Sequence, residues 1–440
     1  MATSDPVVWD VGSRACGKCK QRDAVLIARR DPYCGGCFVR FIRGKQRKPM
    51  GADDRFRVRY HRRHGDDPRH RVAVAALGGV SLVVLVDCVA GMLQDQAHAH
   101  KGRTWFELVV VTIATDDADD TVSARLHQLA ARFPEVSVVV KQVPVAKYID
   151  DKTLYRLRIT PEFAAVAGPP ITGRLTVGEL LAMCVNKLSG EDLLEVVRHQ
   201  LLLEFAVAEG CHTVLYGHSL TRIASDIIAL TVKGRGLAIY RSLNNRTETV
   251  AGAAADVVVM YPLRDVLGAE VSAYATVAGL DELVTAPAVP KLNITKNLTI
   301  RDLTANYFAR LEATGYALTA LAVVKIGDKL APPPGDAQGT CGVCGIDVYH
   351  NPQRWLQRIT VERAAPLATD DERANLAAYE ALAPALAAAA AAGDGAALEL
   401  CYGCTVSLKG AAADMAWPVN PERLGPRYNA DDVINELSLE

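Results

Sequence analysis

The sequence RVAVAALGGVSLVVLVDCVAGM, residues 71–92, contains two apolar runs that are separated by a pair of glycines. The first run has the composition of a strand buried on both faces, and the second run is long enough to form a helix. Gly78 and Gly79 permit a tight turn between the runs, and Ser81 is placed to cap a helix over residues 82–93. The stretch therefore predicts a strand, a turn and a helix in succession.

The double-glycine turn has the backbone of a phosphate-binding loop without its side chains. N–H groups at the start of a helix attract anions, and glycines let a phosphate come close. The neighbours Leu77, Val80 and Leu82 offer no hydroxyl, carboxylate or ammonium group to a nucleotide or its magnesium. For this stretch alone, an ordinary strand-to-helix turn is the simpler alternative.

Strand-like and helix-like segments alternate from residue 71 to about residue 330. The next predicted strands and helices cover residues 106–115, 121–133, 136–143 and 191–209. Two strand–turn–helix segments follow, and the first of them places Gly217 and His218 at the end of its strand. Such alternation predicts an α/β fold with a parallel sheet that binds ligands at the carboxyl edge of its strands, where both glycine turns are expected to lie.

The composition predicts a soluble cytoplasmic protein. Of the 440 residues, 50% are hydrophobic and 22% are charged, and no uncharged apolar run approaches the ~20 residues that a bilayer span needs. The N-terminal stretch has no basic segment followed by an apolar core, so neither secretion nor a membrane partner is expected. Because the net charge is -1, any contact with nucleic acid must come from local clusters of cations.

Eight of the eleven cysteines form four Cys-x-x-Cys pairs, a spacing that favours zinc over disulfides where thiols stay reduced. The first two pairs predict one structural zinc site, with redox chemistry or a coincidental buried pair as alternatives. The last two pairs are separated by 56 residues, and the alternatives to a shared second zinc are separate half-sites or none. The predicted metal ligands are Cys16, Cys19, Cys34, Cys37, Cys341, Cys344, Cys401 and Cys404.

Residues 40–71 form a basic segment with twelve Lys or Arg residues and four Asp residues, a local charge of +8. Histidines and aromatic residues are interleaved with these charges, a pattern typical of segments that contact phosphates and bases. A solvated linker is the alternative. The candidate contacts with nucleic acid are Arg43, Lys45, Arg47, Lys48, Arg62 and Arg63.

Composition divides the chain into five predicted segments. They are a four-cysteine finger with basic residues (1–50), a basic linker (51–70), an α/β domain that begins with the double-glycine turn (71–330), a split four-cysteine module with an alanine-rich insertion (331–410) and a tail (411–440). In the tail, Trp417 is a candidate anchor to a partner or to the domain itself.

Several of these motifs resemble known families. LGGVSL, residues 77–82, resembles the PP-loop of the ATP pyrophosphatases of the adenine nucleotide alpha-hydrolase-like fold, whose pattern is Ser-Gly-Gly-x-Asp-Ser, and it keeps only the two glycines. The order of the motifs is similar to that of the cytoplasmic tRNA 2-thiolation protein 2 family, the degenerate PP-loop subunit of the wobble-uridine thiouridylase heterodimer. The stretches that carry this likeness are CGKCKQRDAVLIARRDPYCGGCF, RGKQRKPM, YGHSLTRIAS, YPLRDVLGAEV, CGVCGIDV and LCYGCTVSL.

The sequence also departs from the active relatives. Thr221 and Arg222, or their neighbours, stand where those relatives carry an Asp-Asp pair. Cys184 and Cys211 lack a paired spacing and are expected to be small buried residues, not holders of an iron–sulfur cluster or of a sulfur relay. His218 is expected to be either a hydrogen-bonded histidine at a strand end or a nucleotide contact.

The resemblance implies a non-catalytic subunit of a cytosolic tRNA thiolase, with two structural zinc ions, no catalytic residue, and neither ATP nor an iron–sulfur cluster. The reaction served would be 2-thiolation of the wobble uridine, giving 5-methoxycarbonylmethyl-2-thiouridine, in Lys, Glu and Gln tRNAs. The partners implied are tRNA, the catalytic thiolation subunit 1 in a heterodimer and, indirectly, a thiocarboxylated ubiquitin-related sulfur carrier. The degenerate nucleotide loop would comprise Gly78, Gly79, Ser81, Gly217 and His218.

Two other functions compete with this one. The first is an autonomous ATP-dependent tRNA sulfurtransferase or adenylating enzyme on the same fold, which requires nucleotide binding by the altered loop. The second is a zinc-finger nucleic-acid-binding protein without a role in thiolation. The α/β segment between the cysteine modules is too large for a spacer, which disfavours the second.

Overall fold

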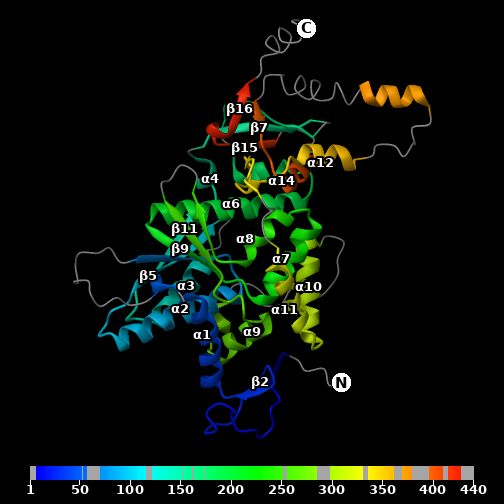
Figure 1. The fold of residues 1–440 in the computed structure, drawn as a ribbon. Coiled ribbons are helices and arrows are strands. Elements are labelled where there is room, and N and C mark those ends of the chain that lie inside the picture. The colour runs from blue at the N-terminus through cyan, green and yellow to red at the C-terminus, as the bar shows by residue number, and fades with distance from the viewer. Residues whose placement is uncertain are drawn as a thin grey trace. The chain divides into compact units, whose positions relative to one another are not determined.

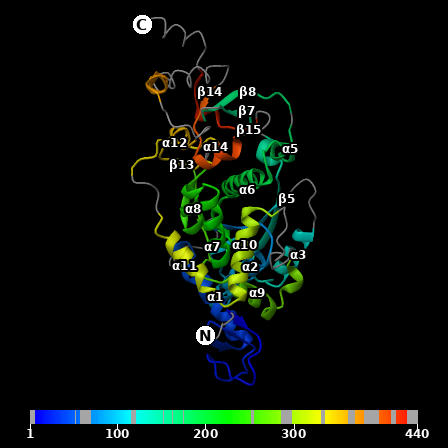
Figure 2. The same ribbon diagram turned by 90° about the vertical axis from the view of Figure 1, so that its right-hand side faces the viewer.

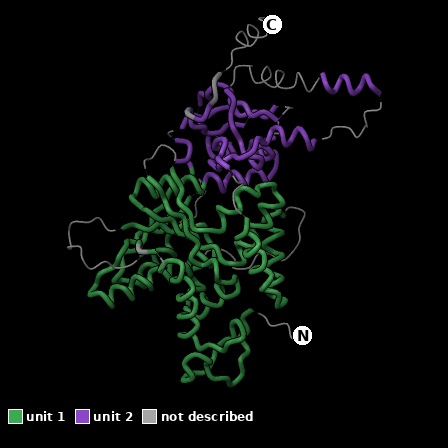
Figure 3. Tube along the Cα trace, viewed as in Figure 1, with its two compact units in different colours: residues 1–145, 198–332 green, residues 146–197, 333–440 purple. Residues whose placement is uncertain are grey.

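The protein divides into two compact units in its computed structural model (Figure 3). Unit 1 comprises residues 1–145 and 198–332, and unit 2 comprises residues 146–197 and 333–440. The structure describes residues 6–51, 53–56, 70–114, 121–150, 152–160, 163–173, 175–250, 255–284, 298–330, 335–360, 369–378, 396–409 and 415–427.

A six-stranded sheet forms the centre of unit 1, in the order β10-β11-β9-β4-β5-β6 (Figure 1). Its parallel strands are β4 (His70–Ala76), β5 (Phe106–Ala114), β6 (Val138–Pro144), β9 (Cys211–Tyr216) and β11 (Asp256–Met260). The edge strand β10 (Arg246–Thr249) is antiparallel to β11. The predicted α/β fold with a parallel sheet is confirmed.

Helices pack around this sheet in two groups. The core helix α2 (Val80–Ala99) contacts α1 (Gly35–Gly51), α3 (Thr121–Ala131) and α9 (Gly268–Val277). In the second group, α7 (Leu220–Val232) contacts α8 (Ile239–Leu243), α10 (Ile300–Ala313) and α11 (Leu318–Gly327). Figure 2 shows α10 and α11 on the side toward the viewer.

Among the described residues, α2 alone is long and apolar enough to cross a membrane by length and composition. Of its most apolar 18-residue window, 72% is buried inside the structure. This burial is what the core helix of an α/β sheet requires.

An ion pair with a buried carboxylate holds the N-terminal finger on the rest of unit 1. Its strands β1 (Val7–Val8), β2 (Leu26–Ala28) and β3 (Asp31–Tyr33) form an antiparallel sheet that leads into α1. The Arg29 guanidinium donates to both carboxylate oxygens of Glu270, at 2.5 and 2.9 Å. Glu270 lies in the first turn of α9 and is fully buried, so the finger is fixed to that helix.

A five-stranded antiparallel sheet in the order β15-β7-β8-β14-β16 forms the centre of unit 2. Its strands are β7 (Leu154–Ile159), β8 (Ala165–Pro170), β14 (Ala396–Leu398), β15 (Met415–Pro418) and β16 (Leu424–Arg427). Because β7 pairs with β15 and β8 pairs with β14, residues 146–197 belong to unit 2, and not to the single α/β domain that the sequence predicts over residues 71–330.

The helices α12 (Pro352–Ile359) and α14 (Tyr402–Leu408) accompany the sheet of unit 2. Trp417 of β15 is fully buried, and its ring centroid lies 5.8 Å from that of Tyr148, so it anchors the tail to its own domain. The remaining elements are η1 (Asp54–Phe56), α4 (Lys147–Asp150), α5 (Val177–Ala182), α6 (Lys187–Ala208), η2 (Gly236–Ala238), η3 (Asp281–Leu283), β12 (Gly339–Thr340), β13 (Asp347–Val348) and η4 (Pro421–Arg423).

Candidate functional site

The double-glycine turn joins β4 to α2, as predicted. Gly78 and Gly79 have φ angles of +88° and +83°, a conformation that only glycine adopts without strain. Gly79 is the N-cap of α2, and no side chain caps the helix. The expectation that Ser81 is the cap is wrong, because the two glycines complete the turn by residue 79 and the helix begins at Val80.

The three residues next to this turn have aliphatic side chains, and two of them are buried. Val80 and Leu82 are buried in the core of unit 1, and Leu77 is 39% exposed. A phosphate held here would meet backbone N–H groups and no cationic or hydroxyl group from these three residues. The turn therefore keeps two glycines with positive φ angles, but the residues next to it are aliphatic.

Gly217 and His218 lie beside the turn, at the carboxyl edge of the sheet. Tyr216, the last residue of β9, is opposite Ala75 of β4. A Cβ atom on Gly217 would lie 3.0 Å from the carbonyl oxygen of Ser81, so glycine lets the two loops approach each other. The ring centroid of His218 is 5.5 Å from those of both Tyr216 and Tyr261, which places this histidine in an aromatic cluster.

Asp226 is a carboxylate at this edge that was not predicted from the sequence. It is buried in α7, where Arg222 Nε donates to Oδ2 at 2.8 Å and Arg301 donates to Oδ1 at 3.2 Å. Burial by itself raises its pKa, but Arg222, Arg301 and His218 hold the pKa below its ordinary value. Asp226 is therefore ionised and already neutralised by two guanidinium groups. The signal in the sequence is the i, i+4 spacing of Arg222 and Asp226 on one helix.

A second carboxylate, that of Glu312, fills the N-terminus of α9. It accepts the N–H groups of Gly268 at 3.2 Å and Ala269 at 3.0 Å, and the hydroxyl group of Thr221 donates to it. Burial raises the pKa of Glu312 above its ordinary value. The helix terminus that follows β11 is thus satisfied by the protein's own carboxyl group, with Thr221 as a second partner.

The four cysteines of the finger lie together. The sulfur atoms of Cys16, Cys19, Cys34 and Cys37 are all within 4.8 Å of one another, and those of Cys19 and Cys34 are 3.8 Å apart. Four thiolates at Zn–S distances of about 2.3 Å would place their sulfur atoms about 3.8 Å apart. Burial alone raises the pKa of Cys16, but backbone N–H groups lower it to about 6. The donor set therefore fits a tetrahedral metal ion.

The two distant C-terminal pairs also meet in one cluster. The sulfur atoms of Cys341, Cys344, Cys401 and Cys404 are within 4.8 Å of one another, and those of Cys344 and Cys401 are 3.6 Å apart. Separate half-sites are thereby excluded. The Gly342 N–H donates to the Glu399 carbonyl at 2.8 Å, which ties the first pair to the strand leading into the second.

The other cysteines do not approach a cluster of this kind within the described residues. Cys88 and Cys211 are buried, and burial raises their pKa values to about 12 and about 11. The expectation of burial is right for Cys211, whereas Cys184 is partly exposed in the turn after α5.

Arg43, one of the predicted nucleic-acid contacts, is partly buried and binds a buried carboxylate. Its Nε donates to the Tyr274 hydroxyl at 3.0 Å, and its Nη2 donates to Asp87 at 3.0 Å. The Tyr274 hydroxyl donates to the same carboxylate at 2.6 Å. A Cβ atom on Gly91 would lie 2.7 Å from the Arg43 guanidinium carbon, so this glycine makes room for the charge. Arg43 therefore has a structural role, and these contacts disfavour the predicted contact with nucleic acid.

The other predicted nucleic-acid contacts differ in whether their side chains already bind groups of the protein. Lys45 donates to the Asp265 carbonyl at 3.0 Å and lies 5.0 Å from the Phe41 ring centroid. Arg47 forms an ion pair with Asp95, and Lys48 is exposed. Arg62 and Arg63 lie outside the described residues.

Replacing Arg43 by Leu is expected to lower the free energy of unfolding by ~3–5 kcal/mol, because it leaves the Asp87 carboxylate buried without its cation. Arg47→Leu is the matched control, since its partner Asp95 is exposed and the loss should stay below about 1 kcal/mol. Urea unfolding measures both. Equal effects of the two variants would contradict an internal role for Arg43, and recovery in Arg43→Leu/Asp87→Leu would support it.

Comparison with known proteins assigns the chain to a family. The family model described as "Cytoplasmic tRNA 2-thiolation protein 2" matches residues 299–406. Among solved structures, the U34-tRNA thiolase NcsA from Methanococcus maripaludis, described with its 4Fe–4S cluster, shares the fold with a TM-score of 0.50 at 14% identity, covering 81% of this chain and 100% of that chain.

Two yeast proteins that carry the same name are similar over nearly their whole length. The Debaryomyces hansenii protein is 39% identical over 433 residues, covering 97% of this chain and 94% of its own. The Scheffersomyces stipitis protein is 41% identical over 430 residues, covering 95% of each chain. The chain therefore belongs to the cytoplasmic tRNA 2-thiolation protein 2 family.

Proposed function

We propose that this chain is the non-catalytic subunit of a cytosolic tRNA thiolase, needed for 2-thiolation of the wobble uridine in Lys, Glu and Gln tRNAs, to 5-methoxycarbonylmethyl-2-thiouridine. The observation that carries the proposal is that the carboxyl edge of the sheet in unit 1 offers few groups for binding a nucleotide. Its loop is aliphatic, the Asp226 carboxylate is neutralised by two arginines, and Glu312 fills the N-terminus of α9. An adenylating enzyme of this fold needs a phosphate cradle and charge compensation for the developing pyrophosphate at this edge of the sheet.

The partner is a catalytic thiolation subunit 1 with the same type of fold. That subunit adenylates the uridine and receives sulfur from a thiocarboxylated ubiquitin-related modifier. The α/β core supports this pairing, because a fold related to that of the partner offers a matching face for a pseudo-symmetric dimer. Family membership supports the place of the chain in tRNA thiolation.

Each four-cysteine cluster holds one structural zinc ion. A zinc ion would bind the four thiolates of a cluster and would cross-link the segments that carry them. It would take no part in the thiolation itself. Both sets of sulfur atoms have the separations that such an ion requires. Cys184 and Cys211 belong to neither of the two cysteine clusters found among the described residues. The proposal therefore includes no iron–sulfur cluster in the core.

The basic segment contacts tRNA through Lys48, Arg62 and Arg63. Replacing the three by Glu is expected to weaken tRNA binding and to reduce the slope of log affinity against log salt by roughly 0.9 for each phosphate that is no longer neutralised. Three exposed lysines outside the segment, Lys101, Lys325 and Lys329, provide a control with the same change of charge. Binding by filter retention over a range of salt measures the slope. An equal reduction of this slope in both variants would show a general effect of charge and would contradict a specific contact by the basic segment.

The alternative is an autonomous ATP-dependent tRNA sulfurtransferase. One observation favours it, since the N-terminus of α2 has no side-chain cap and offers free N–H groups. Calorimetric titration of the full chain with ATP and magnesium separates the two functions. The proposed subunit gives no saturable heat, whereas the alternative requires binding with a defined stoichiometry.

A further inference from the structure

The short helix α12 of unit 2 presents aromatic and cationic side chains outward. Its sequence, PQRWLQRI, has two arginines and no acidic residue. Only Leu356 is buried among its eight residues. Trp355 is 55% exposed, and Arg354 and Arg358 are exposed as well. The helix thus exposes an indole close in sequence to two arginines.

Helical spacing arranges these side chains for a joint contact. Arg354 and Arg358 are four residues apart and share one face of α12, while Trp355 and Ile359 share the adjacent face. The indole therefore has cations along one side of it. Aromatic rings that stack on bases, with cations that contact the neighbouring phosphates, are how proteins hold single-stranded nucleic acid.

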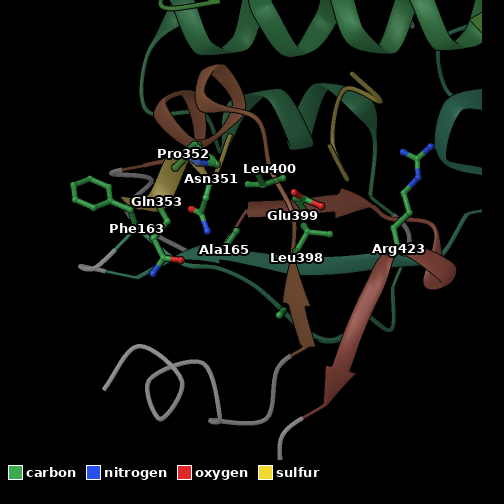
Figure 4. A pocket seen from close by; sticks show the side chains of 11 residues that line it. Phe163, Ala165, Asn351, Pro352, Gln353, Leu398, Glu399, Leu400 and Arg423 are labelled. Carbon is green, nitrogen blue, oxygen red and sulfur yellow. The ribbon is translucent and has the colours of Figure 1, made fainter. Parts of the chain in front are cut away.

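A pocket of about 370 Å³ opens next to the start of this helix. Figure 4 shows Asn351 and Gln353 at one end of it, near Phe163 and Ala165, with Arg423 at the other end. Its volume lies within the range of small-molecule sites. The two amide groups and the Glu399 carboxylate in its wall provide both donors and acceptors, which suits the edge of a base.

The pocket is built on the second cysteine cluster. Its wall includes residues 398–400, which lead directly into Cys401, and Arg423 donates to the Cys341 carbonyl at 3.3 Å. The Asn351 side chain accepts the Arg354 N–H at 3.2 Å, which fixes the start of α12 at the rim. Hydrogen bonds thus position both the wall of the pocket and the start of the helix, as a recognition site needs.

We propose that α12 and this pocket bind an unpaired stretch of tRNA, with Trp355 stacked on one base, Arg354 and Arg358 on the flanking phosphates, and a neighbouring base in the pocket. The inference rests on the proposed function, because it takes tRNA as the ligand. It adds a contact in unit 2 to the basic segment of unit 1.

The test uses the full chain and an unmodified lysine tRNA transcript. Trp355→Ala is expected to weaken binding roughly tenfold, the effect of removing one stacked base. Trp9→Ala is the matched control, since Trp9 is 48% exposed in the finger, and it should bind like the wild type. Arg354→Gln/Arg358→Gln should reduce the salt slope by roughly 1.4, about 0.7 for each phosphate of a single strand. A short single-stranded RNA should compete with the tRNA, and a duplex of equal length should not.

The outcomes distinguish this inference from the proposed function. If the wild type binds tRNA and the Trp355 and arginine variants bind it equally well, the inference fails and the proposed function stands. If these variants bind tRNA normally but no longer associate with the catalytic subunit, α12 is a protein-docking element and the inference also fails. Equal competition by the duplex would overturn recognition of unpaired bases. A wild-type chain without affinity for tRNA would overturn both.

Discussion

If each cysteine cluster holds the proposed zinc ion, replacing Cys404 by Ser is expected to reduce the zinc content from two equivalents to one and to unfold the module around the second cluster. Cys404 is fully buried, and its cluster joins two segments that are 56 residues apart in the sequence. Zinc bound by four thiolates contributes on the order of 10 kcal/mol to the folding of a small module, and most of this disappears when one thiolate is removed. Elemental analysis and proteolysis of the purified variant measure the two effects.

Two further variants show whether the effect belongs to the cluster. Cys34→Ser should remove the other equivalent of zinc and leave the second cluster occupied, because the clusters are built from separate segments. Cys184→Ser lies outside both clusters and should keep two ions and the protease resistance of the wild type. A Cys404→Ser protein that retains two zinc ions, or a wild type with well under one, would contradict structural zinc.

The isolated chain is expected to form no 2-thiouridine, while its catalytic partner loses most of its activity without it. Removing one donor that stabilises a transition-state oxyanion costs on the order of 3 kcal/mol, about a hundredfold in rate. Several such groups are missing here, since Leu77, Val80 and Leu82 surround the turn and Ser81 stands in place of the carboxylate. Reconstitution with tRNA, ATP and a sulfur donor under anaerobic conditions measures the product.

Each component of the reconstitution has its own control. The chain alone, the partner alone and the two together are compared at equal concentrations. Thiolated tRNA from this chain alone would establish the autonomous enzyme. Full activity of the partner alone would remove the need for a heterodimer. Product that appears only with both chains is the result expected of a subunit that positions tRNA.

The elements that the sequence predicts well are those with strong local patterns. β4, β5 and α2 are long apolar runs bounded by turn residues, and their place in a parallel sheet follows from the alternation of strands and helices. The two cysteine clusters were predictable from spacing, because two thiolates on one knuckle supply two corners of a tetrahedron.

Other features depend on contacts between distant residues. The pairing of β8 with β14 joins residues more than two hundred positions apart, and the sequence of neither strand indicates which strand it pairs with. A count of basic residues could not show that Arg43 faces inward, although Asp87 within the apolar run of α2 was a usable signal for a buried partner. The role of Glu312 also depends on a distant contact, because this residue of α10 binds the first N–H groups of α9. Its position in the sequence does not indicate that contact.

The sheet of unit 2 sets an order of events during synthesis on the ribosome. β7 and β8 leave the ribosome early, but β14, β15 and β16, which complete their sheet, are made roughly 250 residues later. At about 5–20 residues per second, the hairpin waits tens of seconds with both edges unpaired. Unpaired strand edges can pair with other chains, so we expect the nascent protein to be prone to aggregation over this interval. The strands at the carboxyl end thus complete the sheet last, and a chain that terminates before residue 396 is expected to leave the β7–β8 hairpin with unpaired edges.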